Sequence, residues 1–342
     1  MEKLRFGLVG CGKMMSSAHT PSLKKLMRDG LPLTVTAVCD VVEERANALA
    51  KEFDAKAYTD FKDMVDDVDA VLIATSHEWH YDIAYFFMTN DKHVLLEKPI
   101  CNTREQCVSL IETSKKHDIT FQCAYPVPYW EGVELMKELL DSGLYGNINQ
   151  MSIWTEQFTK PVEEGKIVRA ETLGGGQLFS HGCHYIDVML DFLGDPLQGV
   201  HMGTNTCTPW MEKEGNSNVI MTFKNGTMAY HYGTWGARGT THGYTFHVHT
   251  DKGMFEYLDG KEATLKFTSN IHPDPDQRKE TIWKLGSTEG HATWREIKHF
   301  LHCVEHHEVP RTNAERALRS LDVIWALYEA EEKNQIADLS HL

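Results

Sequence analysis

The sequence is short of positive charge and has no long basic run. Its 34 lysines and arginines are outnumbered by 49 aspartates and glutamates, so the formal net charge is −15. Basic residues gather in nothing longer than pairs such as Lys24-Lys25 and Lys115-Lys116. Because nucleic-acid-binding proteins neutralise phosphates with clustered lysine and arginine, we expect no nucleic-acid partner.

Long apolar runs and CxxC cysteine pairs are also missing. Without a stretch of about 18 apolar residues we expect no membrane-spanning helix and no membrane partner. A predicted strand begins directly after Met1-Glu2-Lys3-Leu4, which leaves no room for a signal peptide. The eight cysteines form no CxxC pair, a usage typical of free thiols in a reducing compartment. Together these absences predict a cytoplasmic protein.

The composition that is present is that of an ordinary globular protein. Apolar residues make up 42% and charged residues 24% of the 342 positions, which excludes a largely disordered chain. At roughly 100–200 residues per domain, this length predicts two domains or three. A chain this long buries about three quarters of its extended surface on folding, so it needs neither disulfides nor metals for stability.

The first half of the chain alternates between predicted strands and helices. Apolar, β-rich runs lie at 5–10, 33–39, 70–74, 93–97 and 120–124, and helical stretches lie between them at 17–27, 43–53, 80–90 and 103–117. Strands that alternate with helices at this spacing are typical of a parallel sheet with helices on both faces. We therefore predict a doubly wound α/β domain over residues 1–124.

From about Ile148 the pattern changes to long β-rich runs joined by Gly, Asn and Asp turns. These runs lie at 148–158, 197–207, 217–223, 227–235, 244–250 and 263–268. Asn225-Gly226 between two of them is a strong hairpin signal. Helices are expected at 177–193, 291–307 and 313–333, and the last of these can pack back on the first domain. Residues 125–342 are therefore predicted to form an α+β domain with a mainly antiparallel sheet.

A glycine-rich turn follows the first predicted strand. It reads Gly10-Cys11-Gly12-Lys13-Met14-Met15, and a helix comes next. The first glycine permits a tight turn, and the second lets backbone N–H groups approach a pyrophosphate at the helix N-terminus. Asp40 ends the second predicted strand, where its carboxylate can accept hydrogen bonds from both ribose hydroxyls. The pattern predicts a dinucleotide site, although two turn glycines and a surface aspartate would also account for it.

The residues around this motif favour NAD over NADP. Asp40 is followed by Val41 and Val42 rather than by arginine, so a 2′-phosphate would be repelled without a nearby cation to hold it. Met15 stands where a third glycine or alanine is usual, which argues against close helix–strand packing but not against the phosphate turn. We expect NAD as the cofactor.

Three motifs that follow one another along the chain resemble a single family. They are the glycine turn with His19 and Pro21 downstream, then Glu97-Lys98-Pro99 at a strand end with His80 in the helix before it, then Gly174-Gly175-Gly176 leading into Ser180-His181-Gly182-Cys183-His184 and Asp187. The set resembles the glucose–fructose oxidoreductase, inositol dehydrogenase and rhizopine-catabolism family (Gfo/Idh/MocA). The resemblance extends over nearly the whole chain.

The resemblance implies a Rossmann domain followed by a domain with a large open sheet, through which members pair as homodimers or homotetramers. It also implies oxidation or reduction of a sugar or polyol carbon with NAD(P), so a small sugar or polyol is the expected partner. We predict that the cofactor is held by Gly10, Gly12, Lys13, Met14, Asp40, Thr75, Ser76, His80 and Glu97. The predicted substrate contacts are Lys98, Tyr125, Ser180, His181 and His184.

Lys98 and His184 are the two predicted catalytic residues. Oxidation of a secondary alcohol needs a group that takes the hydroxyl proton. Lys98 lies at the carboxyl end of a parallel strand, where ligands bind in doubly wound sheets, and the positive charge of NAD⁺ would favour its neutral form. His184 shares a helix face with Ser180, and imidazole titrates near neutral pH. The plainer interpretations are a surface ion pair for Lys98 and a hydrogen-bonded core histidine for His184.

Two departures from the family pattern bear on the substrate. Ser180 stands where many relatives carry an aspartate four residues before the histidine, so a carboxylate that would orient the base is missing. Either His181, as a substrate donor, or Asp187, as an orienting carboxylate, can take over. A segment from Tyr125 to Trp130 replaces the Asn-Arg of many relatives, which suggests a substrate without carboxylate or phosphate there. Its aromatic residues stack on a sugar face or fill the core.

Other chemistries are open to the same sequence. The pairs His77/His80 and His181/His184 and the cluster His302/His306/His307 have ligand-like spacing, but none has the glutamate of an HExxH motif, so no metal is predicted. A hydrolase or lyase that keeps NAD bound and oxidises a sugar transiently fits the motifs, and so does a non-catalytic NAD sensor. The loops at 160–172, 208–216 and 236–243 are expected to set which sugar is bound.

Overall fold

The computed structural model describes residues 3–160, 169–240, 243–286 and 293–342. The chain divides into two compact units, each with its own sheet. Unit 1 comprises Met1–Pro126 and Ala292–Leu318, and unit 2 comprises Val127–His291 and Arg319–Leu342. Parts of the loops 160–172 and 236–243, and the first residues of the predicted helix 291–307, lie outside the described residues.

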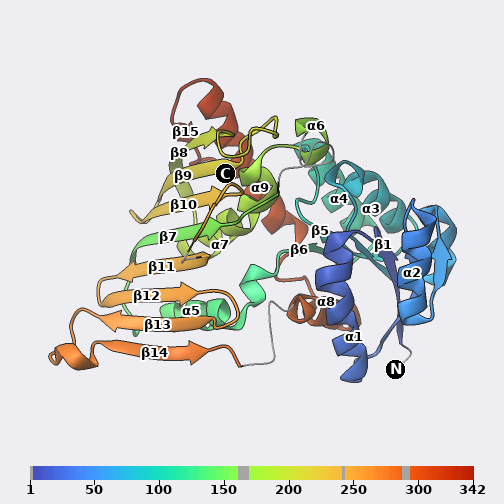
Figure 1. Ribbon diagram of the computed structural model, residues 1–342, viewed down its shortest axis with the longest axis horizontal. Coiled ribbons are helices and arrows are strands. Elements are labelled where there is room, and N and C mark those ends of the chain that lie inside the picture. The colour runs from blue at the N-terminus through green and yellow to red at the C-terminus, as the bar shows by residue number, and fades with distance from the viewer. Residues whose placement is uncertain (1–2, 161–168, 241–242, 287–292) are drawn as a thin grey trace. The chain divides into compact units, whose positions relative to one another are not determined.

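Unit 1 is built on a six-stranded parallel sheet with the spatial order β3-β2-β1-β4-β5-β6. Its strands β1, β5 and β6 are labelled in Figure 1. Its strands are β1 (Leu4–Val9), β2 (Leu33–Cys39), β3 (Lys56–Tyr58), β4 (Ala70–Ile73), β5 (His93–Glu97) and β6 (Phe121–Ala124). The central strand β4 is apolar and wholly buried, as expected for a parallel strand that has both faces covered. The strand order reverses between β1 and β4, and ligands bind outside the carboxyl ends of the strands at such a point.

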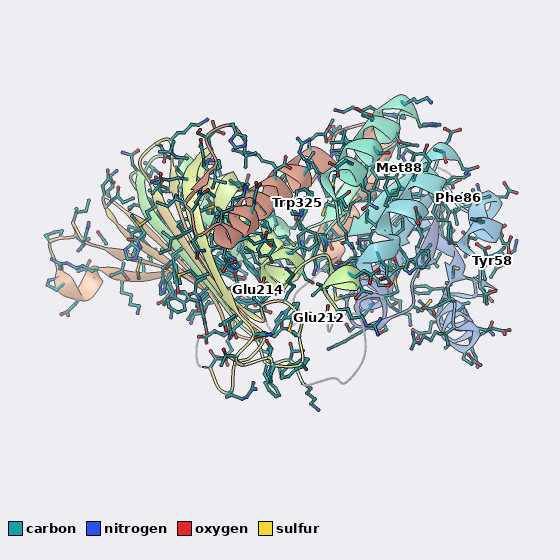
Figure 2. All side chains as sticks on the ribbon, turned by 90° about the horizontal axis from the view of Figure 1, so that it is seen from above. Tyr58, Phe86, Met88, Glu212, Glu214 and Trp325 are labelled. Carbon is teal, nitrogen blue, oxygen red and sulfur yellow. The ribbon has the colours of Figure 1, made fainter. Side chains whose placement is uncertain are left out.

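Helices connect these strands along the chain. They are α1 (Thr20–Arg28), α2 (Glu43–Phe53), α3 (His80–Thr89) and α4 (Arg104–Lys116), with short helical turns at Met15–His19, Phe61–Asp67 and His77–Trp79. The side chains of Phe86 and Met88 mark α3 in Figure 2. The alternation of strand and helix confirms the predicted doubly wound α/β Rossmann fold.

Helix α8 (Trp294–His306) belongs to unit 1 although it comes late in the chain. Ile297 and Phe300 lie on one face by helical spacing, and both are buried in the same core cluster as Phe6. The rings of Phe6 and Phe300 meet edge to face, with their centroids 5.9 Å apart. The apolar face of α8 therefore completes the core of unit 1.

The units are not two continuous halves of the chain. The sequence pattern predicts one break after residue 124, with residues 125–342 in the second domain and the closing helix 313–333 able to pack back on the first. In the structure the first break follows Pro126, and residues 292–318 join unit 1. The physical reason is the apolar face of α8, which has its core partners in the N-terminal part of the chain.

Unit 2 is built on a nine-stranded sheet with the order β14-β13-β12-β11-β7-β10-β9-β8-β15. Its strands are β7 (Ile148–Glu156), β8 (Pro196–Thr204), β9 (Asn216–Phe223), β10 (Met228–Thr234), β11 (Tyr244–Thr250), β12 (Gly253–Leu258), β13 (Thr264–Ser269), β14 (Lys279–Lys284) and β15 (Ala337–Asp338). The pair β7–β10 is parallel and the other pairs are antiparallel. The predicted large, mainly antiparallel sheet is confirmed.

The helices of unit 2 lie before, between and after these strands. They are α5 (Glu131–Asp141), α6 (Ala170–Leu173) and α7 (Cys183–Leu193), with α9 (Ala314–Glu332) beginning in unit 1, and with short turns at Val127–Tyr129, Leu178–Gly182 and Pro275–Gln277. Helix α7 continues directly from the wider π-helical turn at Leu178–Gly182. Among the described residues, no helix is long and apolar enough to cross a membrane.

Some elements were not predicted. The sequence pattern omits α5, although its buried residues Val133, Met136 and Leu140 recur at helical spacing. It also omits β12, which follows β11 after a two-residue turn, and β14, a mostly exposed strand at the sheet edge. An exposed edge strand lacks the alternation of apolar and polar residues that signals a half-buried strand, so the sequence of β14 does not indicate a strand.

Candidate active site

The glycine turn after β1 has the shape that a pyrophosphate site requires. Gly10 has a φ of +88°, and a Cβ placed there would lie 2.8 Å from the backbone of Ala74, so only glycine fits. A Cβ on Gly12 would meet no atom of the described chain within 4 Å. The chain's own packing therefore does not demand glycine at position 12, whereas close approach of a phosphate to the backbone does.

Asp40 at the end of β2 is fixed beside this turn. Its Oδ2 accepts a hydrogen bond from the backbone N–H of Cys11 at 2.8 Å, and its Oδ1 accepts one from Val42 at 2.9 Å. A carboxylate has further lone pairs, so both oxygens can still accept from ribose hydroxyls. Burial and the negative charge of Asp40 raise the pKa of Cys11 to about 12, which keeps this thiol neutral.

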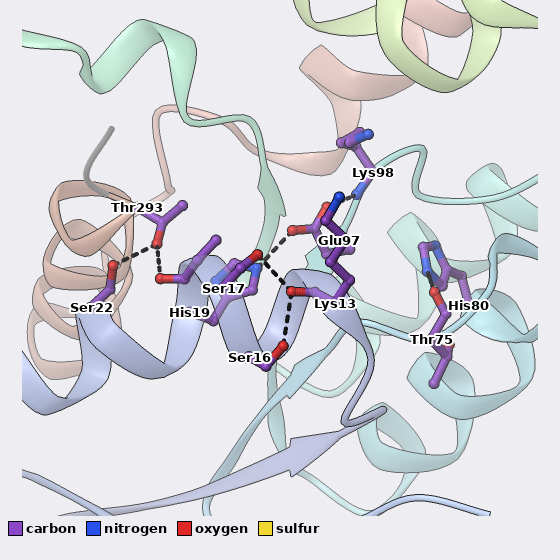
Figure 3. Close-up of polar contacts among 11 residues, drawn as sticks. Lys13, Ser16, Ser17, His19, Ser22, Thr75, His80, Glu97, Lys98 and Thr293 are labelled. Carbon is purple, nitrogen blue, oxygen red and sulfur yellow. Dashed lines mark hydrogen bonds and ion pairs between the residues drawn. The ribbon is translucent and has the colours of Figure 1, made fainter. Parts of the chain in front are cut away.

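The residues between the glycine turn and α1 differ in how far they are buried. Met14 is 42% exposed, while Met15 is fully buried in the core. The chain accommodates Met15 at the start of a wide π-helical turn that precedes α1. Ser17 Oγ donates to the carbonyl of Lys13 at 2.6 Å and so closes the first turn (Figure 3).

His80 links two backbone segments that follow neighbouring strands. Its Nδ1–H donates to the carbonyl oxygen of Pro99 at 2.8 Å. Its Nε2 lies 3.4 Å from the carbonyl oxygen of Thr75, as Figure 3 shows. Thr75 and Ser76 follow β4, and Pro99 follows β5. These contacts hold the strand ends beside the sheet's reversal point, and a contact of His80 with the cofactor stays a prediction.

Glu97 and His19 form a buried pair directly next to Lys98. His19 Nε2 lies 2.7 Å from Glu97 Oε1, and Glu97 Oε2 accepts a hydrogen bond from the backbone N–H of Lys98 at 3.2 Å (Figure 3). Burial acts to raise the pKa of Glu97, but the hydrogen bond from His19 and the positive charge of Lys98 outweigh it, so the pKa is lowered. Lys98 is half-buried at the end of β5.

A second buried carboxyl, that of Glu296 on α8, lies in the same region and was not predicted. Its side chain is 1% exposed, and neither carboxyl oxygen has a hydrogen-bond partner among the described residues. Burial and the nearby charge of Glu97 raise its pKa well above the usual range. A signal was present in the sequence, because Glu296 stands on the face of α8 that Phe300 makes apolar.

Replacing Glu296 by glutamine is expected to increase stability relative to wild type as the pH rises. Because the pKa of Glu296 is raised in the fold, the folded protein holds a proton that the unfolded chain releases above its ordinary pKa of 4.5. The free energy of unfolding of wild type therefore falls between that value and the raised pKa, and the variant lacks this fall. Denaturant unfolding between about pH 5 and about pH 9 measures the difference.

Glu305 gives a matched control because it is exposed on the same helix. Glu305→Gln should follow the pH dependence of wild type. If Glu296→Gln also follows wild type at every pH, the interpretation of Glu296 as a neutral buried acid is wrong.

Ser180, His181 and His184 come together on one helical segment of unit 2. Ser180 and His184 are buried, and His181 is partly exposed. The amide nitrogen of Gln177 lies 3.3 Å from His181 Nδ1, and the hydroxyl of Tyr244 lies 3.4 Å from His181 Nε2. The rings of His181 and His184 meet edge to face, with centroids 5.8 Å apart.

The surroundings of this segment are aromatic and hold a further histidine that stays neutral. Tyr185 stacks on His231 with ring centroids 5.4 Å apart. Burial, with a smaller contribution from His201, lowers the pKa of His231 to about 3. Asp187, one of the two residues considered as a replacement for the missing carboxylate, is buried and accepts a hydrogen bond from Ser320 Oγ at 3.4 Å.

The remaining predicted residues lie in the protein interior. Tyr125 follows β6 in unit 1 and has no exposed surface, so its contact with a substrate stays a prediction. Of the two aromatic residues after it, Tyr129 is buried, and Trp130 packs against Tyr257 with centroids 6.3 Å apart. Tyr129 therefore belongs to the core of unit 2, whereas Trp130 is partly exposed. No group of three or more potential metal ligands comes together within the described residues.

The fold and the glycine turn define a protein with a dinucleotide-binding Rossmann domain joined to a mixed-sheet domain. Two family models match the chain: the "Oxidoreductase family, NAD-binding Rossmann fold" over residues 4–125, and the "GFO/IDH/MocA C-terminal domain" over residues 133–256. The chain belongs to the Gfo/Idh/MocA family. The predicted family and the NAD-binding character of the first domain are confirmed.

Curated relatives and solved structures agree with this assignment. Inositol 2-dehydrogenase of Salmonella typhimurium is 34% identical over 148 residues, which are 42% of this chain and 43% of that enzyme, so this match spans less than half of the relative. D-glucoside 3-dehydrogenase of Escherichia coli is 22% identical over 348 residues, covering 98% of this chain and 97% of that enzyme. Levoglucosan dehydrogenase in complex with NADH and L-sorbose has the same fold, with a TM-score of 0.89, 19% identity and 99% of each chain covered.

Proposed function

We propose that this protein is an NAD-dependent oxidoreductase that oxidises a ring hydroxyl of a sugar, sugar derivative or cyclic polyol by hydride transfer. The observation that carries the proposal is Lys98 at the carboxyl end of β5, next to the buried Glu97–His19 pair, in a domain of an NAD-binding oxidoreductase family. The dehydrogenases of inositol and of D-glucosides among its relatives support this substrate class.

The cofactor is assigned to the strand ends of unit 1. Bound NAD⁺ accepts the hydride from the substrate carbon. Gly10 and Gly12 would let the backbone approach the pyrophosphate, and Asp40 would accept from the ribose hydroxyls. The remaining residues proposed to line the cofactor are Lys13, Met14, Thr75, Ser76, His80 and Glu97. NADP is the less favoured cofactor, because a 2′-phosphate would lie against the carboxylate of Asp40.

Lys98 and His184 are proposed to handle the proton of the reacting hydroxyl. The positive charge of NAD⁺ would favour the neutral amine of Lys98, which can then accept the proton, and the resulting ammonium can polarise the carbonyl oxygen formed. His184 can hold or relay the same proton because imidazole changes charge near neutral pH. Glu97 would act on Lys98 indirectly, since it fixes the backbone at that residue.

We propose that the substrate is neutral where it meets Ser180. A hydroxyl at this position can donate and accept hydrogen bonds but brings no charge. His181 would serve as a substrate donor, and its partly exposed aromatic neighbour Tyr244 suits the apolar face of a sugar ring. Tyr125 is kept as a further proposed substrate contact.

Incubation with NAD⁺ and a panel of free sugars, glycosides and inositols tests the proposal. Reduced nicotinamide, followed by its absorbance at about 340 nm, should accumulate with at least one neutral member of the panel. If no member reduces NAD⁺, the proposal is wrong.

A second candidate function is an NAD-retaining glycoside hydrolase or lyase that oxidises its sugar only transiently. Two observations favour it. Ser180 removes a carboxylate that the family pattern supplies, and one relative is the 2,7-anhydro-N-acetylneuraminate hydratase of Mediterraneibacter gnavus, 25% identical over 208 residues. This function predicts loss of substrate without accumulation of reduced cofactor in solution.

A homodimer or homotetramer is proposed, paired through the open face of the nine-stranded sheet. Met202, Ile220 and Met228 lie on adjacent strands, and the strand registers put them on one face. They are 73%, 44% and 47% exposed. Large apolar side chains exposed together on neighbouring strands are typical of an interaction surface.

We also propose a cytoplasmic location. None of the eight cysteines forms a disulfide, and two of them, Cys11 and Cys207, are partly exposed. Thiols persist in this form in a reducing compartment.

A further inference from the structure

The helical segment that carries Ser180, His181 and His184 begins without a cap of its own. It starts after Gly174-Gly175-Gly176, and Gln177 at its N-cap position makes no capping hydrogen bond with its side chain. The first N–H groups of a helix have no partner within the helix and need acceptors from elsewhere. A segment that starts with three glycines is also entropically costly to hold in one place.

Two residues distant in sequence supply these acceptors. Glu214 precedes β9, and its Oε1 accepts a hydrogen bond from the N–H of Leu178 at 3.1 Å, while its carbonyl accepts one from Gln177 at 2.8 Å. Tyr328 on α9 accepts hydrogen bonds at its hydroxyl from the N–H of Gly176 at 3.3 Å and of Phe179 at 3.2 Å. The first N–H groups of the segment are thus satisfied by a remote cap.

The two capping groups also bind each other. The hydroxyl of Tyr328 donates to Glu214 Oε1 at 2.6 Å, a short hydrogen bond to a carboxylate. Glu214 is 8% exposed, so this bond lies away from solvent. Trp325, which is on α9 like Tyr328 and is labelled with Glu214 in Figure 2, packs its ring against that of Phe179 with centroids 6.1 Å apart. Removing the Tyr328 hydroxyl would take the acceptor from the N–H groups of Gly176 and Phe179, and removing the Glu214 carboxylate would take the acceptor from the Tyr328 O–H.

The third glycine makes room for this cap. A Cβ on Gly176 would lie 2.0 Å from Glu214 Oε2 and 2.3 Å from Oε1. Gly176 is not among the glycines with positive φ, so its backbone would accept alanine. Gly174, in contrast, has a φ of +80° and ends α6. The triple glycine therefore combines a helix-ending turn with an opening for the Glu214 carboxyl.

Titratable and polar groups from α9, β8 and β9 surround the cap. Burial raises the pKa of Glu214, and the hydrogen bond from Tyr328 on α9 and the nearby imidazole of His201 on β8 partly oppose this rise. His201 is itself held by Glu331 of α9 at 2.7 Å and by Ser217 of β9 at 3.0 Å. The cap is therefore part of a connected polar network rather than a single contact.

We propose that Glu214 and Tyr328 are positioning residues that hold the His184 helix in the register its chemistry needs. This inference rests on the proposed function of His184. It states that residues distant in the sequence, Glu214 and Tyr328, hold the segment that follows the three glycines. The cap acts at Gly176–Phe179, one to two turns before His184, so its loss would shift the imidazole along and around the helix axis.

The first test compares Tyr328→Phe with Tyr257→Phe. Tyr257 is a buried tyrosine of the same unit whose hydroxyl donates to Asp259 at 3.3 Å, so it matches the loss of a buried hydroxyl. Tyr328→Phe should lower kcat roughly 10-fold with the KM for NAD⁺ unchanged, since small misplacements of catalytic groups are costly. It should also move the NMR titration midpoint of His184, while Tyr257→Phe should move neither.

A second set of variants keeps the proposal testable if Tyr328→Phe folds poorly. Glu214→Gln retains an acceptor oxygen and should stay near wild type, whereas Glu214→Ala should lose activity as Tyr328→Phe does. Gly176→Ala should cost roughly 10-fold in wild type but less than about twofold in the Glu214→Ala background, because the two changes act on one contact.

The readouts separate this inference from the proposed function. If wild type turns over no sugar, the proposed function fails. The NMR titration midpoint of His184 in the variants still shows whether the cap positions this residue. If Tyr328→Phe and Glu214→Ala lose stability only, with kcat and the titration of His184 as in Tyr257→Phe, the residues are structural and the inference is overturned. Additive losses in the Gly176→Ala and Glu214→Ala pair would overturn it as well.

Discussion

Lys98→Ala is expected to lower kcat about 10³-fold while leaving the Kd for NAD⁺ within about twofold of wild type, a loss within the usual range for a general base. The side chain at the end of β5 would take the hydroxyl proton as the hydride leaves, so its contribution is made in the transition state. Removing it should therefore lower kcat and kcat/KM together. Steady-state kinetics and calorimetric titration of NAD⁺ measure the two quantities.

Lys24→Ala is the matched control, because Lys24 lies in the same unit and pairs with Glu52 at the surface. It should retain wild-type kinetics. Small primary amines added to Lys98→Ala should restore part of the rate, since they supply the missing base. A Lys98→Ala protein with kcat within a few-fold of wild type would contradict the assignment of Lys98.

His184→Ala is expected to lower kcat roughly 10²-fold and to remove one limb of the pH dependence of kcat. Imidazole is the side chain that ordinarily titrates near neutral pH, so its loss should flatten the profile there. A pH series of kcat for wild type and variant, at saturating NAD⁺, measures this. The melting temperature of each protein, measured alongside, separates an effect on chemistry from unfolding.

His306→Ala serves as the control for His184, since His306 is exposed at the end of α8. It should keep both the rate and the pH profile. If His184→Ala lowers kcat without changing the shape of the profile, His184 binds or positions the substrate but does not handle its proton.

Features that depend on residues close together in the chain are predictable from sequence, because short-range patterns determine them. The glycine turn, Asp40 at the end of β2 and the Glu97-Lys98 strand end all follow from residues close together in the chain. Each depends on one strand and the turn after it, where apolar runs and glycines are direct signals. The Rossmann fold and its strand ends were predicted for this reason.

The parts that sequence reasoning missed depend on contacts between distant residues. Glu214 and Tyr328 are separated by 114 positions, and the Tyr328–Phe179 contact spans 149. No periodicity in a single chain links such residues, so the cap of the His184 helix is visible only in the fold. Glu296 is an intermediate case, because its place on an apolar helix face is a local signal whose meaning depends on the burial of α8.

The membership of α8 in unit 1 has the same origin. Its apolar face is evident from sequence, but the choice between two cores is not, because either domain can bury such a face. Phe6 and Phe300, almost 300 residues apart, make that choice in the structure. Helical periodicity therefore predicts that α8 exists, and tertiary packing decides which domain it completes.

Reduction of NAD⁺ by the purified protein with neutral sugars, glycosides and inositols decides whether it is a sugar or polyol dehydrogenase. The reaction is followed at about 340 nm and matched to the ketone formed. Parallel reactions with NADP⁺ and with the Lys98→Ala protein complete the measurement. We expect one reduced nicotinamide per ketone, formed faster with NAD⁺ than with NADP⁺, and almost no reaction with Lys98→Ala. Cleavage of a glycoside without reduced cofactor in solution, or NAD⁺ binding with no turnover of any substrate, would contradict the proposed function.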